Sequence, residues 1–458
     1  MNKHFIIIGG IAAGTKAAAK ARRENNNLQI SLYIDENYIS YSACGLPYFI
    51  EDLFSDPKKL IMRTKEQFKE KENIDIFLNH KVIKIIPDSD EIIVKNLDDN
   101  SESVVKYSNL LIATGASPFV PTIKGINSKN VFTLRSITDG MEIKEKLSCS
   151  KNAVIIGAGY IGMETLEAFV KRGLNTTIIE ISDQIMPVFD KDIAQLLESY
   201  IKEEVSLKIN SKIEILTDDA VNKIITNDKN EVIEVKTTDG KLINADIVLV
   251  STGVRPNIKL AKEVGIEIGQ TGAIKVNSRM QTNIKNIYAA GDCVEQTHII
   301  TETPVWIPLG TTANKQGRVA AINIAGGGSA NFKGVLGSAI TKVFDYTMAI
   351  TGLSEKQAQK ENIDYKMVTV QTKDKAGYMP DAQRITIKLL AAKTTNKLIG
   401  VQIIGKGDVD KRINIMATAL NADMTIEEFL TTDLAYAPPY STSIDPILKA
   451  AQVLGKIM

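Results

Sequence analysis

The chain has 458 residues, 44% of them hydrophobic, and this length allows about two to four domains with large buried cores. Its 55 lysines and arginines nearly balance its 54 aspartates and glutamates, so no overall positive field favours nucleic acid or an anionic membrane as a partner. No apolar run reaches the ~18 residues of a membrane span, and three scattered cysteines suit a reducing compartment. We therefore expect a cytoplasmic protein with no nucleic-acid or membrane partner.

The first predicted element is a β-strand in the run FIIIGGIAAG, which leads into the helix-like stretch TKAAAKARRE. The charges of that stretch favour a helix over the cleavage site of a targeting signal. Gly9, Gly10 and Gly14 lie at the turn, where glycines let backbone N–H groups approach a pyrophosphate at the positive end of a helix. Ile11 fills the middle glycine position and Asp35 closes the next strand, so the segment predicts a βαβ dinucleotide unit of loose pattern.

The next feature is a solitary cysteine, Cys44, in SYSACGLPY. Cys149 and Cys293 lie far away in sequence and in no C-x-x-C spacing. The following LPYFIEDLF predicts a helix with Pro47 in its first turn, so we expect the helix dipole to lower the thiol pKa from ~8.5 into the range ~3.5–7.5. The turn favours redox chemistry at Cys44, and a buried structural cysteine is the alternative.

A second dinucleotide unit follows in VIIGAGYIG, where Gly157, Gly159 and Gly162 complete G-x-G-x-x-G. The next strand, TTIIE, ends in Glu180, close to the ~20-residue offset of an acid that accepts a hydrogen bond from a ribose hydroxyl. A carboxylate repels a 2′-phosphate, and ISDQ after it offers no Arg or Lys, so we expect NADH to be preferred over NADPH. The alternative is that Glu180 merely ends a strand in water.

Further strands follow each unit, in LLIATGASP and in IVLVSTGVRPN, and both end in Thr-Gly. After the glycine run at 326–328 the pattern changes to KMVTVQT, RITIKLL and KLIGVQIIG, which alternate around a turn at KTTN and precede helical stretches. This pattern predicts a separate α+β domain over residues 329–458. DLAYAPPYS, near its end, is too rich in proline and aromatic residues for an ordinary helix.

These motifs together resemble the pyridine nucleotide-disulfide oxidoreductases, and specifically the branch with a single redox cysteine. That branch includes coenzyme A-disulfide reductases, NADH oxidases and NADH peroxidases. SYSACGLPY, YAPPYS and GKGDVDKRIN are similar to the motifs of coenzyme A-disulfide reductases, and the resemblance covers essentially the whole chain.

The resemblance implies an α/β fold with two Rossmann-like domains, one inserted in the other, and a C-terminal dimerisation domain. NIKNIYAAGDC resembles the closing flavin motif of the family and follows the second dinucleotide unit. The FAD-binding domain is therefore expected to be discontinuous, over 1–120 and 278–328. The NAD(P)H-binding domain is expected over 121–277.

Both cofactor sites receive residues from this resemblance. FAD is expected at Gly9, Gly10, Ala12, Ala13, Gly14, Asp35, Thr114, Gly115, Asp292, Gly310 and Thr311. The family usually has its ribose acid one position before Asp35, where this chain has Ile34. NADH, with NADPH as a further possibility, is expected at Gly157, Gly159, Tyr160, Ile161, Gly162, Glu180 and Gly253, and Tyr160 resembles the tyrosine that covers the flavin face. No metal site is expected.

The implied mechanism passes a hydride from NADH to FAD and electrons from the reduced flavin to Cys44. A small disulfide exchanges with that sulfur through a mixed disulfide and supplies the second thiol. Coenzyme A is expected as substrate or as an adduct of Cys44. The resemblance places Lys20, Arg23, Ser40 and His298 at or near its binding site, and Thr15 or Lys16 lies near the start of the same helix as Lys20. A solvated helix face is the alternative for the charged residues, and Ala43 departs from the Asn that such reductases often have there.

Two tyrosines, Tyr436 in YAPPYS and Tyr378 in GYMPD, match family tyrosines that reach the active site of the partner subunit. There a phenol could donate to the leaving thiolate, and the catalytic residues would be Cys44, Tyr436 and Tyr378 of a homodimer that shares its active sites. Packing at the subunit interface is the alternative role.

Other functions remain open at this stage. An NADH oxidase or peroxidase would reduce oxygen or peroxide through a Cys44 sulfenic acid, but such enzymes typically place a histidine in the first glycine loop, where this chain has Ala12. Reduction of a persulfide or polysulfide is a variant of the disulfide chemistry. A non-catalytic, redox-sensing flavoprotein is a second alternative.

Overall fold

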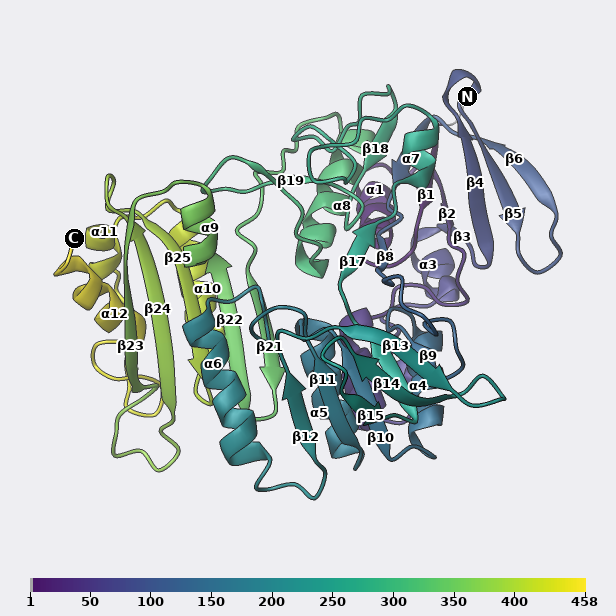
Figure 1. Cartoon of the computed structure of the whole chain (residues 1–458). Coiled ribbons are helices and arrows are strands. Elements are labelled where there is room, and N and C mark those ends of the chain that lie inside the picture. The colour runs from purple at the N-terminus through teal and green to yellow at the C-terminus, as the bar shows by residue number, and fades with distance from the viewer. Residues whose placement is uncertain (1–2) are drawn as a thin grey trace.

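The computed structural model describes residues 3–458 and has a parallel sheet around the first glycine turn (Figure 1). The sheet has the order β18-β7-β1-β2-β3, and all neighbours are parallel. Its strands are β1 (His4–Ile8), β2 (Gln29–Tyr33), β3 (Asp75–Phe77), β7 (Asn109–Ile112) and β18 (Ile287–Ala289). Because β1 lies between two strands and beneath α1 (Ala13–Glu24), which packs on α8 (Gly310–Ala325), four of its five residues are buried.

The chain leaves this sheet and returns to it. Ile287 of β18 pairs with Leu110 of β7, although more than 170 residues separate them in sequence. The arrangement is what an interrupted domain requires. The predicted domain boundaries themselves stay predictions, because the pairing of strands does not fix where one domain ends.

The second glycine turn forms the same pattern in a second parallel sheet, of order β12-β11-β10-β16-β9. Its strands are β9 (Val131–Phe132), β10 (Asn152–Ile156), β11 (Asn175–Ile179), β12 (Ile213–Leu216) and β16 (Ile247–Val250). Helix α5 (Tyr160–Lys171) follows β10 directly, as α1 follows β1. The internal repeat predicted from the sequence is therefore confirmed as two Rossmann-like units.

Each unit also carries an antiparallel sheet that the sequence did not indicate. These sheets are β4-β5-β6 (His80–Ile86, Glu91–Asn96, Glu102–Lys106) and β13-β14-β15 (Val221–Thr226, Val232–Thr237, Leu242–Asn244). Register irregularities in β4 and β13 interrupt the regular alternation of apolar and polar residues that would have signalled strands.

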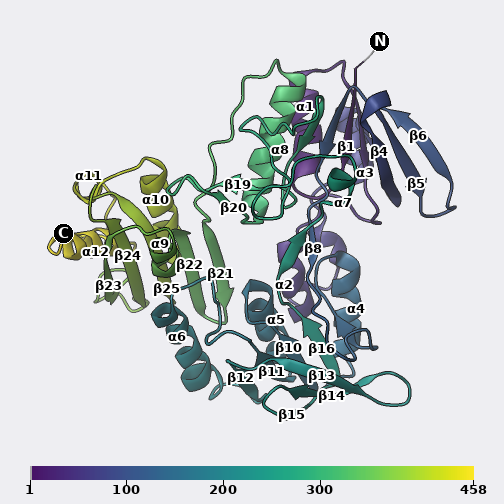
Figure 2. The ribbon, with the colours of Figure 1, turned by 45° about the horizontal axis from the view of Figure 1, so that its top comes forward.

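The C-terminal part contains a five-stranded antiparallel sheet of order β21-β22-β25-β24-β23, seen edge to edge with the second unit in Figures 1 and 2. Its strands are β21 (Ala339–Val343), β22 (Tyr346–Gly352), β23 (Tyr365–Lys373), β24 (Arg384–Ala392) and β25 (Leu398–Gly405). β25 is buried on both faces because α10 (Val409–Asn421) packs on one face and α6 (Lys191–Tyr200) also contacts it. The α+β prediction is confirmed, and β21 and β22 add a hairpin that it did not include.

Shorter helices complete the part of the chain that the structure describes. Those used below are α2 (Leu46–Glu51), α4 (Ile137–Leu147), α9 (Glu355–Lys360) and α12 (Pro446–Gly455). Over residues 3–458, no helix combines the length and apolarity needed to cross a bilayer.

Candidate active site

The first glycine turn joins β1 to the start of α1 at very short range. Gly9 has φ +108°, and a Cβ there would overlap the carbonyl oxygen of Ala113. A Cβ on Gly14 would overlap the carbonyl oxygen of Gly9. Ala12 is the N-cap of α1 and Ala13 its first residue, so their backbone lies at the positive end of the helix. Glycine is required here for close approach, as a pyrophosphate site needs.

The second turn repeats this geometry. Gly157 has φ +100°, and a Cβ on Gly162 would overlap the carbonyl oxygen of Gly157. Gly159 is the N-cap of α5, and a Cβ there would meet nothing within 4 Å, which leaves its backbone open to a ligand. Tyr160 and Ile161, which were predicted to contact the nicotinamide nucleotide, form the first turn of α5.

The acids at the two strand ends have different surroundings. Glu180 is buried and its carboxylate accepts from the backbone N–H groups of Ala158 (2.7 Å) and Ser182 (2.9 Å), so it lies at the mouth of the second glycine turn. Asp35 is exposed and pairs with Lys81 at 3.2 Å. Ile34, not Asp35, lies against Gly10, so the ribose role predicted for Asp35 gains no support from its position.

Loops from distant parts of the chain meet at the edge of the first sheet. The Thr114 hydroxyl donates to the carbonyl oxygen of Asn257 at 2.7 Å, and the Asn257 side-chain amide donates to that of Thr114 at 2.8 Å. Gly115 and Gly253 directly precede the two strands that link the units, β8 (Ala116–Pro118) and β17 (Val254–Pro256). Thr114 and Gly115 therefore lie where the two predicted nucleotide domains join.

Arg135 belongs to this edge, although the sequence analysis did not identify it. Its guanidinium lies 3.3 Å from the carboxylate of Asp292 and close to Gly115. The pairing joins residues 157 positions apart in sequence. No local motif could have shown it, because the segment around Arg135 has no nucleotide-binding pattern.

Cys44 lies in a short 3-10 turn, Ala43–Gly45, that leads into α2, and its side chain is exposed. The sequence predicted a lowered pKa for the Cys44 thiol, and the surrounding protein residues contradict this prediction. Although part of the side chain is accessible to solvent, desolvation by the protein atoms around it raises the pKa of the Cys44 thiol. The carboxylates of Glu164 and Asp292 raise it further, and the guanidinium of Arg135 lowers it. Helix α2, whose dipole the sequence prediction relied on, has only six residues.

Glu164 of α5 is a titratable neighbour of Cys44. Glu164 lies one helical turn after Tyr160, and its carboxylate accepts from the Thr341 hydroxyl of β21 at 2.7 Å. Burial raises the pKa of the Glu164 carboxyl, and Glu164 raises the pKa values of Tyr160 and Tyr48. The carboxyl therefore lies among the thiol and two phenols.

Two of the five buried side-chain polar atoms that lack a partner in the described chain belong to residues near the predicted cofactor sites. Among residues 3–458, the hydroxyl of Tyr160 and Nε2 of Gln316 are buried and accept or donate no hydrogen bond. Gln316 belongs to α8 and its Oε1 accepts from the N–H of Gly291 at 2.8 Å, beside Asp292. Gly310 and Thr311 begin α8 and are exposed. Together with the first glycine turn, these groups suit an FAD.

The charged residues predicted for the substrate follow one face of α1. Lys16, Lys20 and Arg23 are spaced by four and three residues, so they share that face. Lys20 pairs with Glu24, and Arg23 is exposed. Thr15 is buried, and its hydroxyl donates within the helix rather than outward.

Ser40 and His298, also predicted to contact substrate, differ in accessibility. Ser40 is half-buried, has φ +53°, and its N–H donates to the Gly10 carbonyl oxygen at 2.9 Å, so it lies beside the first glycine turn. His298 is only 3% exposed, and its Nδ1 accepts from the N–H of Ile300 at 3.3 Å. Burial lowers the pKa of His298 to about 4, so it is neutral and internal in this chain.

Tyr378 and Tyr436 lie on irregular loops of the C-terminal part and are 74% and 50% exposed. The N–H of Ala376 donates to the carbonyl oxygen of Pro438 at 3.4 Å, which holds the two loops together. Tyr440, which the sequence analysis did not single out, is 67% exposed on the second loop. Large aromatic side chains this exposed indicate a surface that another molecule covers.

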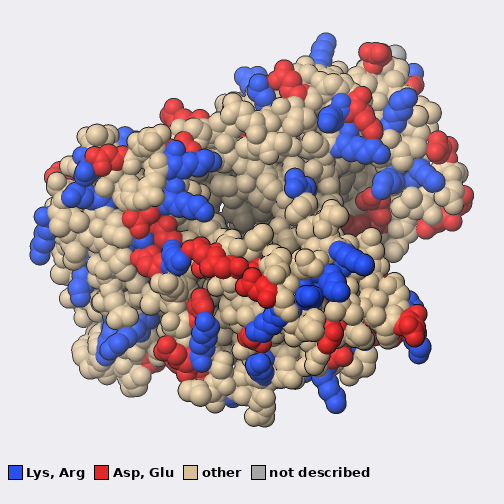
Figure 3. All heavy atoms as spheres, viewed as in Figure 1, with Lys and Arg blue, Asp and Glu red and all other residues tan. Residues whose placement is uncertain are grey.

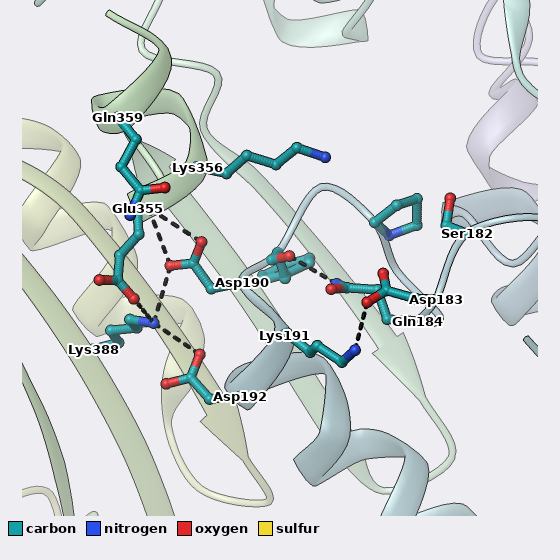
Figure 4. A pocket seen from close by; sticks show the side chains of 12 residues that line it. Ser182, Asp183, Gln184, Asp190, Lys191, Asp192, Glu355, Lys356, Gln359 and Lys388 are labelled. Atoms are coloured by element: carbon teal, nitrogen blue, oxygen red, sulfur yellow. Dashed lines mark hydrogen bonds and ion pairs between the residues drawn. The ribbon is translucent and has the colours of Figure 1, made fainter. Parts of the chain in front are cut away.

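A cavity of about 560 Å³ lies between the start of α6 and α9 (Figure 4). Lys388 of β24 points into a group of three carboxylates there, at 3.2 Å from Asp190, 2.8 Å from Asp192 and in contact with Glu355. The carboxylates lie close enough for a metal ion, but the ammonium already lies among them. In Figure 3, Asp and Glu side chains gather in a row across the middle of this face.

Comparisons with known proteins agree with this architecture. Residues 3–317 match the family model described as pyridine nucleotide-disulphide oxidoreductase, and residues 338–446 match its dimerisation domain. An NAD(P)H coenzyme A polysulfide/persulfide reductase of Pyrococcus horikoshii is 38% identical over 99% of both chains. An NADH oxidase of Methanocaldococcus jannaschii is 38% identical over 98% of this chain and 97% of its own length. A coenzyme A disulfide reductase of Staphylococcus haemolyticus is 30% identical over 96% of both.

A solved structure extends the similarity to three dimensions. The NAD-dependent persulfide reductase of A. fulgidus has a TM-score of 0.94 and 37% identity, and the match covers 99% of this chain and 83% of the other. Both nucleotide turns, the thiol between them and the C-terminal sheet lie within the matched length. The chain therefore belongs to the pyridine nucleotide-disulphide oxidoreductase family and is an oxidoreductase.

Proposed function

We propose that the protein uses NAD(P)H and FAD to reduce coenzyme A disulfide, or a related small disulfide, persulfide or polysulfide, at Cys44. The observation that carries the proposal is the position of Cys44. Its electrostatic neighbours include Asp292 and Arg135 at the flavin-binding edge and Glu164 on the helix of the second glycine turn. Residues near both predicted nucleotide sites thus influence Cys44, which supports it over the buried Cys293 as the redox thiol.

When bound, FAD supplies two-electron transfer between the nicotinamide and a sulfur atom. Tyr160, at the start of α5, would cover the flavin face until the nicotinamide displaces it. The Cys44 thiolate attacks one sulfur of the substrate disulfide, forms a mixed disulfide and releases the first thiol. Two electrons and a proton then break that bond and release the second thiol, so NADH, one further proton and one disulfide give NAD⁺ and two thiols.

The substrate and the partner are proposed from the surroundings of this thiol. The basic face of α1, with Lys16, Lys20 and Arg23, suits the phosphates of coenzyme A, and Ser40 lies near its start. His298 fits this role poorly because it is buried. The dimerisation domain supports a homodimer, in which Tyr378 and Tyr436 of one subunit would complete the site of the other.

Oxygen or peroxide reduction is the main rival. Such enzymes typically use a histidine in the first glycine loop beside the sulfenic acid, and none of the three histidines of this chain lies in that loop. His4 bonds to the Lys106 carbonyl and to Ser31, His80 bonds to a neighbouring carbonyl, and His298 is buried. We therefore favour sulfur chemistry over oxidase activity.

NADH is proposed as the preferred donor over NADPH. Glu180 is held at the second glycine turn, and the cavity that opens at Ser182 is lined by four acids and three lysines. A 2′-phosphate would meet this net negative charge. A higher kcat/KM for NADPH than for NADH would contradict the proposal.

The test is NADH consumption under argon with coenzyme A disulfide, with Cys44→Ser and Cys149→Ser as a matched pair. We expect rapid turnover in the wild type and in Cys149→Ser, and at least a thousandfold loss in Cys44→Ser, which should still accept electrons from NADH. Consumption that requires oxygen or peroxide would favour the oxidase, and none with any acceptor would favour a redox-sensing flavoprotein. Thiol production by Cys44→Ser at the wild-type rate would contradict the proposal.

A further inference from the structure

We infer that Arg412 is a positioning residue for disulfide reduction, because its buried guanidinium ties together the two loops that carry Tyr378 and Tyr436. The inference rests on the proposed function, which places these tyrosines at the active site of the partner. Arg412 lies on α10 in the motif GKGDVDKRIN, to which no role has so far been given. It is completely buried.

The guanidinium donates to three separate places in the fold. Nη2 donates to the Asp374 carbonyl oxygen at 2.6 Å, and Nη1 donates to the Asp408 carbonyl oxygen at 2.9 Å. Nε and Nη2 each lie 3.1 Å from the carboxylate of Asp445, in a two-pronged pair. A planar fork with fixed donor directions is needed for this arrangement, and a lysine cannot reproduce it.

The first of these contacts fixes the loop of Tyr378. Asp374 follows the last residue of β23 and precedes Tyr378 by four residues. Its N–H and carboxylate bond to the carbonyl oxygen and N–H of Gln383 at 2.9 and 2.8 Å, which closes the loop at its base. Arg412 holds that closed base against α10.

The contact with Asp445 fixes the loop of Tyr436. Asp445 is the N-cap of α12, and its carboxylate also accepts from the Ser441 hydroxyl at 2.8 Å. Residues 432–437 have no regular structure, and the N–H of Ser441 donates to the Ala437 carbonyl oxygen at 3.1 Å, which joins the end of this segment to the Asp445 contact. One buried cation therefore positions both exposed tyrosines relative to each other.

Lysine keeps the positive charge beside Asp445 but lacks the planar fork that also reaches the Asp374 and Asp408 carbonyl oxygens. The expected effect of Arg412→Lys is therefore displaced loops and a loss of turnover. We expect kcat with coenzyme A disulfide to fall at least tenfold, while flavin reduction by NADH under argon and KM for NADH stay within twofold of wild type. Asp423→Asn, which removes an exposed ion pair with Lys397 in the same part of the chain, is the control and should have no effect.

The decisive measurement is a double-mutant cycle with the pair Tyr378→Phe and Tyr436→Phe. If Arg412 acts through the tyrosines, Arg412→Lys lowers kcat in the wild type but causes no further loss once both hydroxyls are gone. The same loss in both backgrounds, or none in the wild type, overturns the inference. If sedimentation shows that Arg412→Lys does not form a dimer, Asp445→Asn replaces it in the cycle. This variant keeps the shape of the Asp445 side chain, and the same two outcomes apply.

The cycle also separates this inference from the proposed function. Full turnover by the double phenylalanine variant would overturn the role of the tyrosines, and the inference with it. A loss in that variant without a loss in Arg412→Lys would overturn the inference alone.

Discussion

At the residue scale, the carboxyl of Glu164 opposes the negative charge that Cys44 needs for nucleophilic attack. The carboxylate raises the pKa of the thiol, so its removal should lower that pKa. We expect Glu164→Gln to shift the pH profile of Cys44 alkylation by iodoacetamide toward lower pH, measured on the reduced holoprotein by mass spectrometry. Glu66→Gln, which changes an exposed carboxyl, is the control. An unchanged profile, or one shifted to higher pH, would contradict this reading.

His298 gives a prediction about stability at acid pH. Burial lowers the pKa of His298 from 6.5 to about 4, so below pH 6.5 the unfolded chain binds a proton that the folded chain does not. Its neutral burial thus adds stability above pH 6.5 that is lost progressively toward pH 4. At pH 5 this loss amounts to about 2 kcal/mol.

The measurement compares wild type with His298→Asn, whose amide oxygen can still accept from the Ile300 N–H. We expect denaturant unfolding midpoints of wild type to fall further than those of the variant between pH 7.5 and pH 5. Equal shifts in the two proteins would show that His298 is protonated in the folded state.

At the element scale, the two glycine turns have the same backbone geometry, and each is proposed to bind a different nucleotide. Gly14→Ala and Gly162→Ala each place a methyl group against the carbonyl oxygen of the first glycine of the turn. We expect Gly14→Ala to lose bound FAD, measured as flavin absorbance per chain. Gly162→Ala should keep its FAD but lose NADH-driven reduction at least tenfold. Loss of FAD in both variants, or in neither, would contradict separate sites.

The local sequence pattern predicted the strands that lead into the glycine turns. β1 and β10 combine a buried apolar run with glycines that the following turn requires, so the sequence located both. The helix predicted after Cys44 is longer than the observed α2. The observed helix ends early because the backbone of Asp52 adopts a left-handed conformation. The β21–β22 hairpin was missed because its strands carry no distinct turn signal.

At the scale of the whole molecule, hydrogen bonds and an aromatic stack join the second nucleotide unit to the C-terminal sheet. Glu167 of α5 is buried and accepts from the N–H of Phe344 at 2.7 Å. Tyr200 of α6 stacks on Tyr346 with ring centroids 3.9 Å apart. These contacts, with the Lys388 group, hold α5 and α6 against the sheet that carries the exposed tyrosines.

Lys388 tests how much this fastening stabilises the protein. Lys388→Met would leave buried Asp190 without its cation, which costs about 3–5 kcal/mol in comparable cases. Lys397→Met, which breaks an exposed pair, should cost about 1 kcal/mol or less. The measurement is the urea midpoint of the holoprotein. A shift for Lys388→Met no larger than that for Lys397→Met would show that the group is solvated.

The sequence by itself determined the two nucleotide units, the solitary cysteine at a turn and the C-terminal strands. These features are written in contiguous stretches, because the spacing of glycines and apolar residues depends only on neighbours along the chain. The family resemblance rested on the same local motifs.

Only the tertiary structure decided how the titratable groups behave. The pKa of Cys44 depends on Glu164 and Arg135, and the loops of Tyr378 and Tyr436 depend on Arg412. Each of these contacts joins residues far apart in sequence. Burial and distance between such residues arise only when the chain folds, so no local pattern could predict a raised thiol pKa or a shared guanidinium.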